Sequence, residues 1–194
     1  EAVVCYRESL RQYPDAPTTH GNLIFALHYQ AGTSPSEIAS AHREWGRRHA
    51  AGLPRLAPGA SSHLAVDRPL RVGLVSAAFR QHPVGGLAQI FARHLNPAEF
   101  IPFVYDAGLR SDSLTKTLQS LIPNWRPIGR LADEKIAHLI QEDRIDILVD
   151  LSGHSSGNRL LAFARHPAAI QVALFAYPNT TGLEAMDYRI TDAW

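Results

Sequence analysis

The sequence has 194 residues, of which 45% are hydrophobic and 19% are charged. This length and composition are typical of a globular protein with one sizeable core and a smaller appendage. The formal net charge is only +1 and the arginines are scattered, so nothing in the charge pattern favours a nucleic acid or an anionic membrane as partner.

The number of cysteines and the length of the apolar runs further limit the class of protein to which the chain can belong. The single cysteine, Cys5, cannot form an intramolecular disulfide, and its place among Val3, Val4 and Tyr6 in a helical pattern predicts a small core side chain. No apolar run is long enough to span a bilayer, and the N-terminus lacks a signal-like pattern. We therefore expect a cytoplasmic protein.

Helical patterns fill the first fifty residues. A first apolar stripe ends at a proline-containing break over residues 14–17, and a second stripe includes Ile24 and Leu27. Ser34 is a candidate cap for a third helix, because Pro35 follows it directly and Glu37 stands three residues after it. His42 and His49 both fall near the Trp45 side of that helix.

The segment from 53 to 69 shows little periodicity and contains Pro54, Pro58 and Pro69, so it is the predicted linker between a helical part (1–52) and a second part (70–194). The second part alternates apolar runs with amphipathic stripes, which predicts a Rossmann-like α/β lobe with a parallel sheet covered on both faces. The expected strands are 70–76, 100–106, 125–128, 145–151, 170–176 and 188–191, and the expected helices lie around 87–95, 114–121, 136–140 and 160–164.

Two of these strands run directly into polar turns that hold a histidine, His82 in one case and His154 in the other. Both turns are expected at the same edge of the sheet, the edge where ligands of open α/β sheets bind. Because Pro83 favours the first turn of a helix, His82 is placed at a helix N-terminus. The helix dipole disfavours an imidazolium there and leaves a neutral ring suited to acid–base work, although a simple capping role is the alternative.

Other polar residues allow two interpretations each. Gly85 and Gly86 do not complete a Gly-x-Gly-x-x-Gly pattern, which disfavours a nicotinamide cofactor. Arg159 is suited to a phosphate or a carboxylate, or is an unpaired surface arginine. The run from Tyr177 to Gly182 forms either a phosphate-binding nest or a tight turn. The residues alone give His49 no role beyond packing or solvation.

Several motifs, taken in order, resemble the protein O-linked N-acetylglucosamine transferase family in its bacterial form. These motifs are RVGLVS (71–76), HP (82–83), IDILV (145–149), GH (153–154), PAAIQ (167–171), YPNTTG (177–182) and DYRITD (187–192). The helical start resembles the last tetratricopeptide unit and linking helix of that family. The resemblance implies an inverting, metal-independent glycosyltransferase of GT-B architecture, of which only the first of two Rossmann-like lobes is expected in this chain.

The resemblance also implies roles for individual residues. It places His82 and His49 at the catalytic centre, where their rings are expected to meet across a shared pocket. It assigns substrate binding, on the sugar-diphosphate side of the cleft, to ten residues: Pro83, Val84, His154, Arg159, Ala176, Tyr177, Pro178, Asn179, Thr180 and Thr181. The implied donor is UDP-N-acetylglucosamine, the implied acceptors are serine and threonine hydroxyls of proteins, and neither a cofactor nor a metal is implied.

One departure from the family pattern and one motif shared with other relatives keep alternatives open. Animal members of the family carry an aspartate where this chain has Ala78, so a proton relay through that aspartate cannot operate here. Plant O-fucosyltransferase relatives share the YPNTTG run, which keeps GDP-fucose as an alternative donor. A non-enzymatic tetratricopeptide adaptor is the third interpretation, although one helical hairpin is short for a free-standing array.

Overall fold

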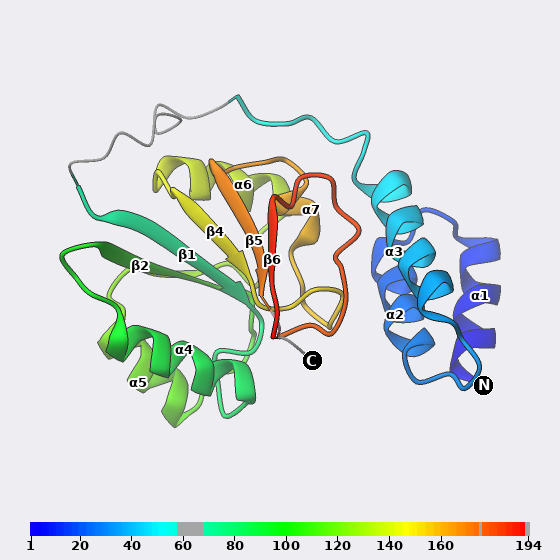
Figure 1. The fold of residues 1–194 in the computed structure, drawn as a ribbon, viewed down its shortest axis with the longest axis horizontal. Coiled ribbons are helices and arrows are strands. Elements are labelled where there is room, and N and C mark those ends of the chain that lie inside the picture. The colour runs from blue at the N-terminus through cyan, green and yellow to red at the C-terminus, as the bar shows by residue number, and fades with distance from the viewer. Residues whose placement is uncertain (58–67, 175, 193–194) are drawn as a thin grey trace.

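The computed structural model describes residues 1–57, 68–174 and 176–192. Most of the predicted linker, residues 58–67, therefore lies outside the described residues. The chain begins with three helices, α1 (Ala2–Gln12), α2 (Pro17–Leu27) and α3 (Pro35–His49), which stand at one end of an α/β lobe (Figure 1).

The capping box predicted for the third helix is confirmed. The backbone N–H of Glu37 donates to the Ser34 hydroxyl at 3.2 Å, and the backbone N–H of Ser34 donates to the Glu37 carboxylate at 2.7 Å. The prediction that Cys5 is a core side chain is wrong, because its side chain is exposed. Helix α1 packs against α2 and has no fully buried residue, but the apolar stripe of Val3, Tyr6 and Leu10 is half-buried.

The lobe contains a sheet of six strands in the order β3-β2-β1-β4-β5-β6, and every pair of neighbouring strands is parallel. The prediction of a parallel α/β sheet is thus confirmed. The elements of the lobe are β1 (Leu70–Ser76), α4 (Pro83–His94), β2 (Phe100–Asp106), α5 (Ser113–Leu121), β3 (Trp125–Pro127), α6 (Asp133–Glu142), β4 (Ile147–Asp150), α7 (Leu160–Phe163), β5 (Ile170–Leu174) and β6 (Tyr188–Ile190).

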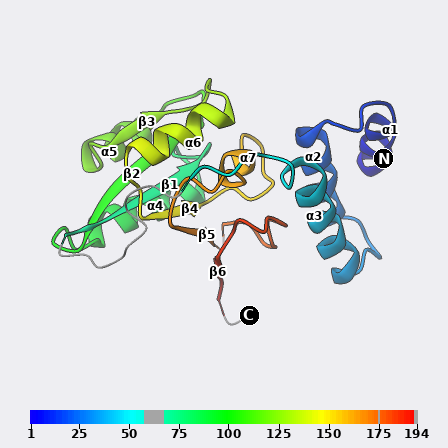
Figure 2. The same ribbon diagram turned by 90° about the horizontal axis from the view of Figure 1, so that it is seen from above.

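Strand residues alternate between two apolar cores, as the pleat of a sheet requires. Val72 and Leu74 of β1 pack in the core that α4 and α5 cover, whereas Val75 packs in the core of α6 and α7. This second core continues into the helical segment through Ile24 of α2 and Trp45 of α3. Seen from above, α1–α3 again lie at the end of the lobe where α7 and β6 are found (Figure 2).

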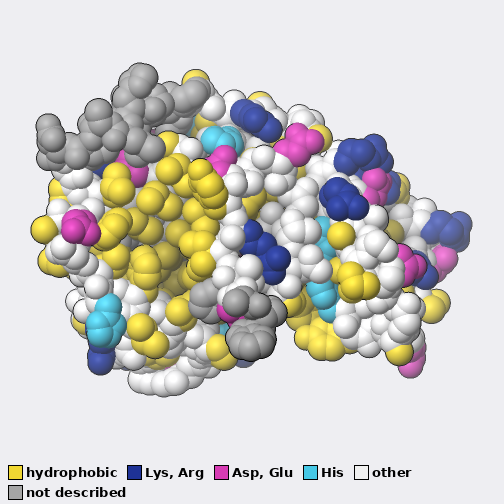
Figure 3. Space-filling view, viewed as in Figure 1, with side chains coloured by type: hydrophobic (Ala, Val, Ile, Leu, Met, Phe, Trp, Pro, Cys, Tyr) yellow, Lys and Arg dark blue, Asp and Glu magenta, His cyan; other side chains and the backbone are white. Residues whose placement is uncertain are grey.

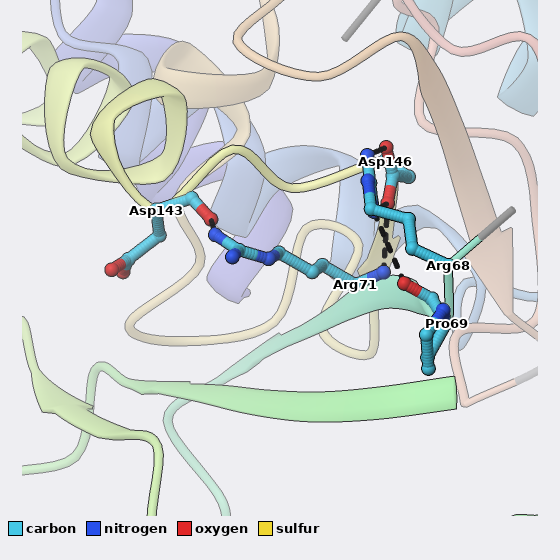
Figure 4. Close-up of polar contacts among 5 residues, drawn as sticks. All are labelled: Arg68, Pro69, Arg71, Asp143 and Asp146. Atoms are coloured by element: carbon cyan, nitrogen blue, oxygen red, sulfur yellow. Dashed lines mark hydrogen bonds and ion pairs between the residues drawn. The ribbon is translucent and has the colours of Figure 1, made fainter. Parts of the chain in front are cut away.

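The fourth strand is shorter than predicted, because Asp146 forms a polar anchor ahead of it. Both carboxylate oxygens of Asp146 accept from the Arg68 guanidinium at 2.8 Å, and one also accepts from the backbone N–H of Arg71 at 2.8 Å (Figure 4). Burial acts to raise the pKa of Asp146, but these bonds outweigh it and the pKa lies below its usual value. The anchor ties the start of β1 to the start of β4.

One face of the sheet is only partly covered by the described helices. Hydrophobic side chains gather there, on the side of the sheet that faces the viewer in Figure 3. Ile90 of α4 is 60% exposed, and all three residues of β6 are exposed, including Tyr188 and Ile190. The later residues of β1, β2 and β4 are nonetheless mostly buried, and turns of the candidate site extend from β1 and β4.

Candidate functional site

The two histidine-bearing turns extend from the same edge of the sheet, as predicted. Strands β1 and β4 are parallel neighbours, with Val75 aligned to Asp150, so the turns after them leave side by side. Strand β5 pairs with β4 in the same direction, which brings the loop that begins at Ala176 to this edge as well. This carboxyl edge is the candidate site.

His82 is the exposed histidine of this edge. It is the N-cap of α4, and its Nδ1 accepts a hydrogen bond from the backbone N–H of Val84 at 3.2 Å. Because the lone pair of Nδ1 is engaged, a neutral His82 ring carries its proton on Nε2. His82 lines an open hollow together with Gln81, Pro83 and Ser113. The ring therefore offers an N–H donor to a ligand.

The substrate-binding role predicted for Val84 is not available to its side chain. That side chain is only 6% exposed and packs in the core with Ala88, and the Val84 amide is taken by His82. Pro83, in contrast, is exposed beside His82.

The expectation that His49 and His82 meet across one pocket is wrong. The Nε2 of His49 lies 3.0 Å from the Nδ1 of His20 on α2, and its ring packs against Trp45 at 5.5 Å. Figures 1 and 2 both show α3 well apart from α4, whose first turn carries His82. Helix α3 packs on α2, and its residues His42 and Gly46 lie against Gly182 in the loop after β5.

The structure instead gathers histidines at the junction between the helical segment and the lobe. We call this group the histidine cluster, and it comprises His20, His28, His42, His49 and His154, interleaved with Trp45 and Tyr177. Sequence reasoning gave no role to His20 or His28 and placed His42 only near Trp45. The signal that points to His20 is its spacing from Ile24 on the apolar face of α2, which indicates burial.

His42 is fully buried and uses both of its ring nitrogens. Its Nδ1 lies 2.7 Å from the backbone carbonyl of Ile38, and its Nε2 lies 3.0 Å from the hydroxyl of Tyr177. Since a carbonyl can only accept, Nδ1 carries the proton and the Tyr177 hydroxyl donates to Nε2. Burial lowers the pKa of His42 to about 4, so the ring is neutral at pH 7.

His154 is buried in the same junction and does not reach the site surface. It is 1% exposed, its Nε2–H donates to the backbone carbonyl of Thr181 at 2.8 Å, and its ring meets that of Trp45 at 4.8 Å. Burial lowers its pKa to about 3. The turn at Gly153, whose φ is +51°, precedes a ring that packs on Trp45 and His42 of α3, and the substrate contact predicted for His154 stays a prediction.

The loop after β5 divides into buried and accessible residues. Tyr177 and Thr181 are buried, whereas Ala176 and Pro178 are exposed and Asn179 and Thr180 are half-buried. The Thr180 amide donates to the Asn179 side chain at 2.8 Å, and the Gly182 amide donates to the Thr180 hydroxyl at 3.2 Å. These internal bonds shape the loop and leave four accessible residues for a ligand.

Arg159 does not point into the site. Its guanidinium donates to the backbone carbonyls of Ile128 and Gly129 at 3.3 and 2.8 Å, and it lies 3.7 Å from the carboxylate of Asp133. The ligand contact predicted for Arg159 stays a prediction, and the contacts described here hold its guanidinium against the backbone. Arg159 instead fixes the loop between β3 and α6.

Asp150 is a buried carboxyl that sequence reasoning did not single out. It accepts from the backbone N–H groups of Ser152 at 3.1 Å and Gly153 at 2.8 Å. Burial raises its pKa to about 6, and the two N–H groups limit the rise. Asp150 thereby holds the turn that carries His154.

The helices described in residues 1–57, 68–174 and 176–192 include none that is long and apolar enough to cross a membrane. In the same residues, no three His, Cys, Asp or Glu side chains are grouped so that they could hold a metal ion. The rings of the histidine cluster pack on one another and form hydrogen bonds.

The fold and its carboxyl edge define a doubly wound α/β lobe of the kind that binds nucleotides. The model of glycosyl transferase family 41 matches residues 56–194, and the chain belongs to this family.

Three relatives show how far the similarity reaches. The chain is 35% identical, over 98% of its length, to a protein of Oryza sativa subsp. japonica named probable UDP-N-acetylglucosamine--peptide N-acetylglucosaminyltransferase SPINDLY. It is 33% identical, over 74% of its length, to the protein of Arabidopsis thaliana that bears the same enzyme name and is called SEC. A solved structure of the Thermobaculum terrenum O-GlcNAc transferase, a K341M mutant, is 38% identical over 98% of the chain with a TM-score of 0.90.

The matches cover only part of each relative. The chain spans 21% of the rice protein, 14% of the SEC protein and 36% of the Thermobaculum terrenum chain. The similarity thus concerns one lobe and the helices before it.

The buried histidines make the stability of the fold depend on pH. Burial lowers the pKa of His20 and of His42 to about 4 and that of His154 to about 3, whereas an unfolded histidine titrates near about 6.5. Between these values the unfolded chain binds more protons, so stability is complete above pH 6.5 and is lost as pH falls. Asp150 has the opposite effect on stability. Its pKa in the folded state is raised to about 6, so just below this pH the folded chain binds one proton that the unfolded chain does not.

We therefore expect the free energy of unfolding to change little between about pH 7 and 8 and to fall by about 2 to 3 kcal/mol per pH unit between about pH 6 and 4.5. Urea unfolding at each pH measures this slope. The variant His138→Asn, which alters an exposed histidine of α6, should keep the slope. A free energy of unfolding that stays constant down to pH 4.5 would show that the cluster is not buried and neutral.

Proposed function

We propose that this chain is the first catalytic lobe, with its preceding helices, of an inverting transferase that moves N-acetylglucosamine from UDP-N-acetylglucosamine to serine or threonine hydroxyls of proteins. The observation that carries the proposal is membership of glycosyl transferase family 41, together with 38% identity at a TM-score of 0.90 to an O-GlcNAc transferase. The names of the plant relatives supply the donor and the peptide acceptor.

The domain assignment belongs to the same proposal. We assign residues 1–52 to tetratricopeptide-type helices and a linking helix, 53–69 to a linker, and 70–194 to the catalytic lobe. The antiparallel packing of α1 on α2, with the outer face of α1 open, supports a helical array. A cytoplasmic location is proposed from the use of a single cysteine.

In the proposed reaction the acceptor hydroxyl attacks the anomeric carbon, the bond from that carbon to the diphosphate breaks, and UDP leaves. His82 contributes an Nε2–H donor at the site, because its Nδ1 is held by the Val84 amide. That donor is suited to hold an oxygen of the sugar, of the diphosphate or of the acceptor. In this tautomer His82 does not accept the hydroxyl proton, which passes instead to a phosphate oxygen or to water.

The accessible residues of the loop after β5 form the rest of the proposed binding site for the donor. Ala176, Pro178, Asn179 and Thr180 reach solvent at the same sheet edge as His82 and Pro83. No metal or organic cofactor is part of the proposal, and charge on the leaving diphosphate is assigned to N–H donors and basic side chains.

Calorimetric titration of the complete protein tests the donor assignment. UDP and UDP-N-acetylglucosamine should bind, and GDP-fucose should not. Binding of GDP-fucose in preference to the uridine ligands would make the protein an O-fucosyltransferase. Absence of binding by all three ligands would leave the adaptor function.

Replacement of His82 tests its role in the complete protein. His82→Ala removes both the helix cap and the ring, whereas His82→Asn retains a side chain that caps helices well. Both variants should lose turnover by about a hundredfold, while His82→Asn keeps the melting temperature of the wild type more closely than His82→Ala. Turnover close to that of the wild type in His82→Asn would reduce His82 to a capping residue.

A further inference from the structure

The hydrogen bond between His42 and Tyr177 joins the helical segment to the candidate site. Tyr177 is 3% exposed and His42 is fully buried, and their polar atoms lie 3.0 Å apart. Burial raises the pKa of Tyr177, so the hydroxyl keeps its proton. The direction of the bond is fixed, because Ile38 already holds the only N–H of the neutral His42 ring.

The same hydroxyl reaches a second ring of the cluster. The Nε2 of His28 lies 3.5 Å from the Tyr177 oxygen. Since the single hydroxyl proton of Tyr177 is donated to His42, a contact with His28 requires that His28 donates from Nε2. The half-buried ring of His28 then keeps the lone pair of its Nδ1. One carbonyl, that of the half-buried Ile38, thus sets the orientation of three successive polar groups.

At its C-terminal end, the 176–182 loop is held against α3 by close contacts between backbone atoms. Gly182, with a φ of +74°, lies against the His42 carbonyl so closely that a β-carbon at position 182 would overlap it. Position 46 on α3 has equally little room, because a β-carbon there would overlap the Gly182 carbonyl. Gly153 lies in the same way under the ring of Tyr177. Residues 177 and 182 are therefore both held, and the accessible residues Pro178, Asn179 and Thr180 lie between them.

We propose that His42 and Tyr177 are positioning residues, whose hydrogen bond holds the 176–182 loop in the shape that binds the sugar nucleotide. This inference rests on the proposed function. Through this bond the helical segment determines the shape of the loop that binds the donor, although no residue of α3 needs to contact the donor. Loss of the bond should weaken donor binding more than it slows the chemical step.

Four variants of the complete protein separate positioning from simple packing. Tyr177→Phe removes only the hydroxyl. His42→Asn retains an N–H where Nδ1 stands but cannot reach Tyr177, whereas His42→Gln places a carbonyl acceptor near the former Nε2. Tyr13→Phe is the matched control, because Tyr13 is 69% exposed at the end of α1.

The measurements are KM for the donor, kcat, and the hydrogen exchange of loop amides at a temperature where every variant is folded. We expect Tyr177→Phe and His42→Asn to raise the donor KM about three- to tenfold with a smaller change in kcat, and to speed amide exchange in residues 176–182. His42→Gln should restore most of the wild-type KM, and Tyr13→Phe should change nothing. A fifth variant that combines Tyr177→Phe with His42→Asn should be no worse than either single variant.

The possible failures can be told apart. If the wild-type protein binds no uridine nucleotide, the proposed function fails, and amide exchange alone decides whether the bond positions the loop. If the wild type binds and Tyr177→Phe matches Tyr13→Phe in both donor KM and exchange, the positioning role is overturned while the function stands. Should Tyr177→Phe not fold, the comparison of His42→Gln with His42→Asn gives the same decision.

Discussion

Imidazole rings can pack as closely as they do between α3 and the loop after β5 only while they are uncharged. His42 and His154 lie 5.1 Å apart, ring centre to ring centre, and both are buried. A proton on either ring would place a cation in an apolar junction, where the hydrogen-bond partners of the two rings among the described residues are carbonyls and a hydroxyl and not carboxylates. Neutrality of these rings is therefore the condition under which the helical segment and the lobe share one core.

The neutral state of these rings also determines which ring nitrogen carries the hydrogen. Neutral His42 must carry its proton on Nδ1, and neutral His154 must carry its proton on Nε2, because each faces a backbone carbonyl there. The exposed His82 follows the same logic, since the Val84 amide leaves its proton on Nε2. The junction therefore contains buried histidines that contact the loop after β5, whereas the open edge contains one exposed histidine, His82.

Local patterns in the sequence predicted most of the fold. The apolar runs at 70–76 and 100–106 became β1 and β2 with the same bounds, and the capping box at Ser34 formed because its partners are only three residues apart. Shared strand direction then correctly placed the turns of His82 and His154 at one edge.

The orientation of polar side chains could not be predicted in this way. The partner of His42 is 135 residues away in the chain, and Arg159 finds its carbonyls about 30 residues earlier. Burial of His154 depends on the left-handed turn at Gly153, and the separation of His49 from His82 depends on how α3 packs. Such contacts are set by the assembled fold, so local periodicity carries no signal for them.

Nitrogen chemical shifts of the imidazoles, recorded in long-range proton–nitrogen spectra of the complete protein, report protonation and tautomer directly. At pH 7 we expect His42 as the Nδ1–H tautomer and His154 as the Nε2–H tautomer, and we expect both rings to be still neutral at pH 5. Charged rings, or shifts averaged between tautomers, at His42 and His154 would contradict a neutral, buried junction.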